Sequence, residues 1–98
     1  MRLEWDPEKN RANSEKHGVS FEEASELFSG DLDFLDIYDE AHSGMEDRFI
    51  AIGPIKRGVV VVVYTERQDD VIRVISARMA TPRERQSLDE YWRGHDER

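Results

Sequence analysis

A histidine and a set of arginines are the side chains of this sequence best suited to chemistry on a negatively charged substrate. Histidine is the side chain whose charge ordinarily changes between pH 5 and 8, and His17 is directly preceded by Lys16. Further along the chain, arginines stand within or at the ends of segments rich in β-branched residues, at positions 48, 67, 73 and 78. A guanidinium binds two phosphate oxygens at once. The set therefore suits cleavage of a phosphodiester, although a carboxylate-binding site would use the same residue types.

Cleavage of RNA without a metal needs a base for the 2′-hydroxyl, an acid for the 5′-oxygen and fixed positive charge beside the phosphorane. Histidine and arginine can supply these functions. The three histidines, His17, His42 and His95, are too scattered to form a helical metal-binding pair, and no carboxylate spacing resembles a calcium loop. We therefore expect neither a metal nor another cofactor.

The length and composition predict one small domain. With 98 residues, 38% of them hydrophobic, and no cysteine, the chain can build a single core without disulfides. We expect one domain over residues 1–98, with about 93–98 as a frayed tail. The longest apolar run, Val59 to Tyr64, is far shorter than the roughly 20 residues that span a bilayer, and the N-terminus does not resemble a signal peptide. We therefore expect a cytoplasmic protein.

Charge is unevenly distributed along the chain. The net charge of −8 argues against general electrostatic capture of nucleic acid. Residues 1–47 hold four Lys/Arg against fourteen Asp/Glu, whereas residues 48–98 hold ten against eight. An anion site should therefore draw on the second half, while the acidic first half would suit a basic partner.

The first predicted helix is unusual because it is almost entirely polar. It runs from Pro7 to about His17, with Asp6 as its N-cap and Gly18 as its left-handed end. Ala12 is its one apolar side chain, so hydrophobic burial alone gives this helix little reason to pack.

Three polar residues of this helix, Asn10, Asn13 and His17, share one face. In one interpretation the two amides bond to backbone groups, and the cations Lys16 and His17 offset the helix dipole. In the other, Lys16 and His17 belong to a functional site. The sequence leaves both interpretations open.

Two further helices and five strands complete the prediction. Ser20 with Glu23, and Thr81 with Glu84, form capping boxes that start the second and third helices. Loops are expected at 41–47 and 53–58. Strands are predicted by alternation and β-branched residues at Arg2–Trp5, Phe34–Tyr38, Arg48–Ile52, Val59–Thr65 and Val71–Ala77.

These elements predict an α+β domain in the order β-α-α-β-β-β-β-α. Short, hairpin-compatible connections favour an antiparallel sheet, with two N-terminal helices and one C-terminal helix covering one of its faces. The valine-rich strand Val59–Thr65 should be central. In the last strand, simple alternation places Arg73 with Ala77 on one face and Arg78 with Ser76 on the other. These arginines would line an anion site or pair with the acids of the first half.

Several segments carry a resemblance that covers the chain from Leu3 to about Tyr91. They are Trp5-Asp6-Pro7-Glu8-Lys9, Ala12-Asn13, Lys16-His17-Gly18-Val19-Ser20-Phe21-Glu22-Glu23-Ala24, Glu46-Asp47-Arg48, Val61-Val62-Val63-Tyr64-Thr65-Glu66-Arg67 and Arg73-Val74-Ile75-Ser76-Ala77-Arg78. Together they resemble the BrnT toxin family. The resemblance implies a RelE-like fold, RNA cleavage as a bacterial type II toxin, and neutralisation by a BrnA antitoxin that itself binds DNA.

Carried over residue by residue, the resemblance implies a site built from Lys16, His17, Glu46, Arg48, Arg67 and Arg78. His17 would act as acid or base, with Glu46 as a partner in proton transfer. The arginines would stabilise phosphate charge, and Lys16 would be a further cation. The alternative interpretation is a degenerate toxin that binds a protein partner but no longer cleaves.

Overall fold

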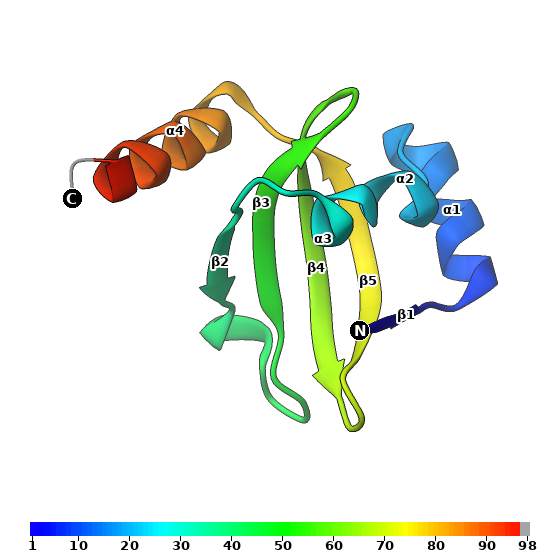
Figure 1. Ribbon diagram of the computed structural model, residues 1–98. Helices are drawn as coiled ribbons and strands as arrows, with labels where there is room; N and C mark the ends of the chain where they lie inside the picture. Colours follow the sequence, from blue (N-terminus) through cyan, green and yellow to red (C-terminus); the bar gives the residue numbers. More distant parts are fainter. Residues whose placement is uncertain (97–98) are drawn as a thin grey trace.

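Five strands form one mixed sheet in the computed structural model, which describes residues 1–96 (Figure 1). The strands lie in the order β1-β5-β4-β3-β2. Their bounds are β1 (Arg2–Glu4), β2 (Leu35–Tyr38), β3 (Phe49–Ile55), β4 (Gly58–Arg67) and β5 (Val71–Met79). The central position expected for the valine-rich strand is confirmed, because β4 lies between β3 and β5.

The expectation of a purely antiparallel sheet is wrong. Strands β2 to β5 pair antiparallel, but β1 pairs parallel with β5, with Leu3 level with Ile72. The hairpin argument does not apply to β1, because three helices separate it from the next strand. Both β1 and β5 run away from the end of the sheet that holds the β4–β5 turn. That end is called the lower end here, and the end with the β3–β4 turn is the upper end.

The predicted start and end of the first helix are confirmed. In α1 (Pro7–His17), Asp6 accepts a hydrogen bond from the Glu8 amide at 2.9 Å, and Gly18 ends the helix at φ 71°. Ser20 caps the next helix by accepting from the Glu23 amide at 3.0 Å.

The expected second helix is two short ones, α2 (Phe21–Ala24) and α3 (Glu26–Ser29). They meet at Ser25, whose hydroxyl bonds the Phe21 carbonyl and so competes with the helical pattern. A 3₁₀ turn, η1 (Glu40–His42), lies in the expected loop at 41–47.

The last helix, α4 (Pro82–Asp96), begins with the predicted reciprocal cap. Thr81 accepts from the Glu84 amide at 3.2 Å, and the Thr81 amide donates to Glu84 at 2.9 Å. The helix includes residues 93–96 of the expected frayed tail, and residues 97–98 lie outside the described part. No helix within residues 1–96 is long and apolar enough to cross a membrane.

The helices cover both faces of the sheet, so the expectation of one covered face is wrong. Helices α1 to α3 pack on one face, where Phe21, Leu27, Val62 and other buried residues form the main core. On the opposite face α4 buries Leu88 against Ile52 and Val61. Among the described helices only α4 packs on this second face, at its upper end, where the chain leaves β5 (Figure 1). The rest of that face is called the open face.

Strand β3 continues through residues 53–55, which were expected to belong to a turn. Gly53 is required there, because a Cβ would come within 2.6 Å of the Phe34 Cβ and 2.8 Å of a Leu27 methyl. The absent side chain lets α3 and the start of β2 lie directly on the sheet.

A β-bulge changes which face the arginines occupy. Val63 pairs with Ser76, but the next residue of β4, Tyr64, pairs with Val74, so Ile75 is the extra residue. The bulge shifts the alternation by one, and Arg73 therefore shares the open face with Arg78. The expectation that these two arginines lie on opposite faces is wrong, because simple alternation takes no account of a bulge.

Candidate functional site

The asparagines of α1 are structural. Asn13 is buried and donates to the Ala77 and Val19 carbonyls at 2.8 and 3.0 Å, while its oxygen accepts from the Ala77 amide at 3.1 Å. The Asn13 side chain thus makes the hydrogen bonds to the β5 backbone that a neighbouring strand would otherwise make. Asn10 accepts from the Phe21 amide at 2.8 Å and so holds α2 on α1. These four hydrogen bonds explain how a polar helix packs.

Lys16 and His17 are exposed at the C-terminal end of α1. With Ala12, Ile75 and Ser76 they line a shallow hollow of about 260 Å³ beside β5. This set is called the His17 hollow. It lies on the bulge, and Ser76 shares the open face with Arg78.

Arg78 is held by a carboxylate of its own chain. Its two terminal nitrogens donate to the two oxygens of Glu84, each at 2.7 Å. The hydrogen bonds from Arg78 are the main reason that the pKa of Glu84 falls to about 2, and the same pairing raises the pKa of Arg78. The two terminal nitrogens of Arg78 can bind a phosphate together only after the Glu84 carboxylate has moved away from them.

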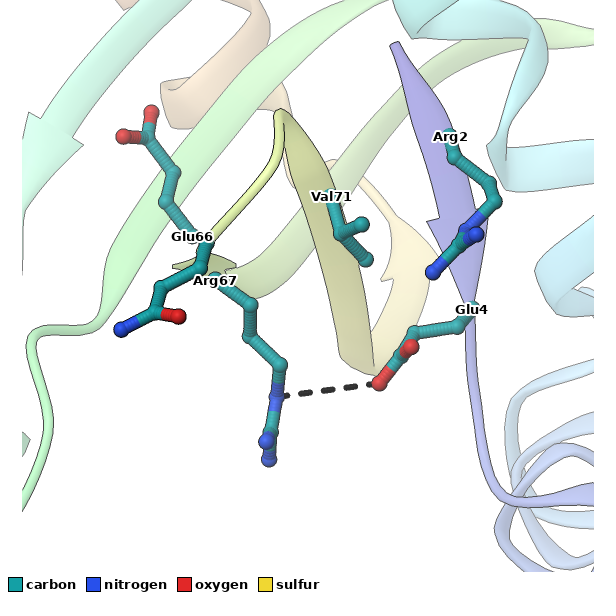
Figure 2. A pocket seen from close by; sticks show the side chains of 6 residues that line it. Arg2, Glu4, Glu66, Arg67 and Val71 are labelled. Atoms are coloured by element: carbon teal, nitrogen blue, oxygen red, sulfur yellow. Dashed lines mark ion pairs between the residues drawn. The ribbon is translucent and has the colours of Figure 1, made fainter.

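A second group of charges lies at the lower end of the open face. Arg73 donates to Glu4 at 2.9 Å, and Arg67 Nε lies 3.7 Å from the same carboxylate oxygen. Figure 2 shows Arg67 and Glu4 pointing toward each other past Val71, with Arg2 beside them. We call Arg2, Glu4, Arg67 and Arg73 the Glu4 cluster. A shallow hollow of about 490 Å³ opens over it.

Arg48 lies across β4 from this cluster. Phe49 pairs with Tyr64 and faces the main core, so alternation places Arg48 on the open face, level with Thr65. Thr65 in turn pairs with Arg73. The Nε atom of Arg48 is buried and has no hydrogen-bond partner among the described residues.

Glu46 is exposed on the loop before β3, two residues from Arg48. It therefore lies near the lower end of the sheet, whereas His17 lies at the far end of α1 (Figure 1). Arg78 pairs with Val61, which lies four residues from Thr65 along β4. The level of Arg78 is therefore about 13 Å from the level of Thr65 along the strand. The structure thus divides the expected site residues into Lys16, His17 and Arg78 at one end, and Glu46, Arg48 and Arg67 at the other.

Sequence reasoning missed Arg2 and Glu4. Alternation along Arg2–Glu4 already places both on one face of the first strand, which was a usable signal. Their neighbours were not predictable, because the parallel pairing of β1 with β5 joins residues about 70 positions apart. Within residues 1–96, no group of three or more His, Asp or Glu side chains is placed to hold a metal ion.

Comparisons with known proteins agree with this architecture. The family described as the ribonuclease toxin BrnT of type II toxin-antitoxin systems matches residues 5–84. The chain belongs to this family. The crystal structure of the Brucella abortus ribonuclease toxin BrnT is similar over 83% of this chain and 97% of the other, with 29% identity and a TM-score of 0.66. No curated protein sequence matches the chain at a significant level.

The BrnT match covers the structure from Trp5, after β1, to Glu84 in the first turn of α4. All six residues expected to form the site lie within it. Glu4 lies one residue before the matched segment, and Arg2 three residues before it. The resemblance to BrnT toxins is confirmed, and with it the assignment to ribonuclease toxins of type II toxin-antitoxin systems.

Proposed function

We propose that this BrnT-family chain has a RelE-like fold, that it is a metal-independent endoribonuclease, and that it acts in the cytoplasm. One observation carries the proposal: arginines from three neighbouring strands meet on an uncovered sheet face. Arg48 directly precedes β3, Arg67 ends β4, and Arg73 lies in β5. Fixed guanidinium groups stabilise the charge of a phosphorane without a metal.

In this proposal Arg48 and Arg67 hold the phosphate at which RNA is cut. Arg48 supports the assignment because alternation places it on the open face at the level of Thr65, which pairs with Arg73. Glu46 is the expected partner in proton transfer, and its loop leads directly into Arg48.

In this proposal the RNA beyond the cleaved bond contacts three further residues, Lys16, His17 and Arg78. A role for His17 as acid or base requires the substrate to reach along the whole of α1, about 16 Å. Arg78 contributes only when Glu84 releases it.

The proposed inhibitor is a BrnA-like antitoxin, which would also provide the link to DNA. An antitoxin segment that folds on binding can cover the arginines, while its basic residues face the acidic N-terminal half of the toxin. The affinity of this complex should fall as salt is added. A tight complex that is indifferent to ionic strength would refute the electrostatic part alone.

The test of the function is expression followed by cleavage in a chelator. Induced expression should arrest bacterial growth, and the purified protein should cut RNA at an undiminished rate in EDTA. Cleavage that appears only with added divalent ion would contradict the proposal.

The alternative is a toxin-like module that binds a partner without cleaving. The pairing of Arg78 with Glu84 favours it, because one expected phosphate ligand is already occupied. A folded protein that binds the antitoxin and leaves RNA intact with and without metal would establish this alternative.

A further inference from the structure

Glu4 is the carboxylate that the structure places between Arg67 and Arg73 at the lower end of the open face. Its oxygen Oε2 accepts from Arg73 and lies near Arg67, whereas Oε1 has no hydrogen-bond partner among the described residues. The side chain is 35% exposed, at the hollow that opens over the cluster. One oxygen is therefore fixed in position and the other is accessible.

We propose that Glu4 is the proton acceptor for RNA cleavage, an inference that rests on the proposed function. Glu4 Oε1 takes the proton of the ribose 2′-hydroxyl, and the 2′-oxygen forms a bond to phosphorus. The bond from phosphorus to the 5′-oxygen breaks, and the 5′-oxygen takes a proton from water in the open hollow. The products are a 2′,3′-cyclic phosphate and a 5′-hydroxyl, and Glu4 returns its proton to water.

The surroundings of Glu4 suit this role in two ways. Arg73 fixes the orientation of the carboxylate, since the two residues are level neighbours on adjacent strands. Arg2 and Arg67 line the hollow on either side and can hold the phosphate beside the accessible oxygen (Figure 2). A base, its orienting partner and the phosphate ligands thus lie in one place.

Two other carboxylates provide comparisons: Glu66 is the matched control, and Glu46 is the competing candidate for proton transfer. Glu66 lines the rim of the same hollow, but its carboxylate points away from Glu4 in Figure 2. Glu46 lies two residues from Arg48 in the chain and does not line this hollow. Each is exposed, and each removes the same charge when it is changed to glutamine.

The experiment measures single-turnover cleavage of a labelled RNA oligonucleotide in EDTA by the wild type and by Glu4→Gln, Glu46→Gln and Glu66→Gln. The affinity of each protein for the same oligonucleotide with 2′-O-methyl groups is measured in parallel. Loss of a general base lowers the rate of Glu4→Gln by about 10² to 10⁴-fold. Its RNA affinity stays equal or becomes tighter, because a negative charge is removed. Glu66→Gln keeps a rate near that of the wild type, whereas Glu46→Gln measures separately the role in proton transfer that is proposed above for Glu46.

A Glu4→Gln variant that binds and cleaves like the wild type would overturn the proposal, and so would a large rate loss in Glu46→Gln alone. In either case an active wild type leaves the proposed function standing, whereas an inert wild type overturns the function itself. A second measurement needs no variant. The wild type should release a 2′,3′-cyclic phosphate and fail to cut a 2′-deoxy linkage, and cleavage of that linkage would refute the step.

Discussion

The two ends of the open face hold the same kind of cation in opposite electrostatic settings. At the upper end Arg78 has a carboxylate to itself, and both terminal nitrogens are bonded to Glu84. At the lower end Arg73 and Arg67 share the single carboxylate of Glu4, and Arg2 lines the same hollow. Positive charge is therefore balanced at the first place and in excess at the second.

This difference shows that strand position alone does not make an arginine a phosphate ligand. What matters is how many carboxylates of the chain already compete for its guanidinium. The same reasoning explains how a chain with a net charge of −8 can carry an anion site, because most of its acids lie in the first half and the last helix, although Glu66, Asp69 and Asp70 lie at the β4–β5 turn. We therefore place catalysis at the Glu4 cluster.

Among the changes that compare the two ends of the open face, the largest effect is expected for Arg67→Ala. Removing a fixed donor from the developing phosphorane should lower the single-turnover cleavage rate by about 10² to 10³-fold. Arg78→Ala is the matched change at the upper end, and it should cost less than about tenfold in rate, since its guanidinium is held by Glu84. Equal losses of rate, or a larger loss for Arg78→Ala, would contradict the proposed difference between the two ends. Denaturant melts check that both variants fold.

The Asn13→Ala change tests whether cleavage depends on the His17 hollow or on the sheet. It removes three hydrogen bonds and leaves the Ala77 amide without its partner, so the free energy of unfolding should fall by about 2–4 kcal/mol in urea melts. Cleavage per folded molecule should persist, because the Glu4 cluster is built from β1, β4 and β5. A stable variant that no longer cleaves would instead place the chemistry beside α1.

Glu84→Gln tests the Arg78–Glu84 pair at the upper end through the pH dependence of stability. The depressed pKa of Glu84 means that its pairing stabilises the protein above the ordinary carboxyl pKa of 4.5, and that this contribution is lost as pH falls toward about 2. The variant should be less stable by about 1–2 kcal/mol at pH 7, with a shallower loss between pH 5 and 2. An unchanged pH profile of stability would show that the pair contributes little.

The smallest effect is expected for His17→Gln. His17 is exposed at the end of α1, so loss of its favourable interaction with the helix dipole should cost up to about 1 kcal/mol of stability. Cleavage should change by less than about tenfold, whereas loss of an essential acid or base would lower the rate by about 10² to 10⁴-fold. Single-turnover rates on this variant therefore decide whether the upper end takes part in proton transfer.

The sequence was sufficient to predict most of the local structure. Caps at Asp6, Ser20 and Thr81 are short-range patterns, because the side chain and the amide that it satisfies are at most three residues apart. The central strand was equally accessible, since five consecutive valines are typical of a strand covered on both faces.

Long-range and irregular features could not be predicted in the same way. The parallel pairing of β1 depends on contacts with β5, and the bulge at Ile75 depends on how β5 fits β4. Together these two features bring Glu4, Arg67 and Arg73 into one cluster. Periodicity identified the arginines as candidates, but only tertiary structure shows which carboxylate each one meets.

The most direct test of the account is to observe where RNA binds. Non-cleavable 2′-O-methyl RNA is titrated into ¹⁵N-labelled protein, and the side-chain Nε–H signals of the arginines are followed by NMR. The account predicts the largest shifts at Arg48, Arg67 and Arg73, with Arg78 little changed. Shifts confined to Arg78 and the last turn of α1 would contradict it.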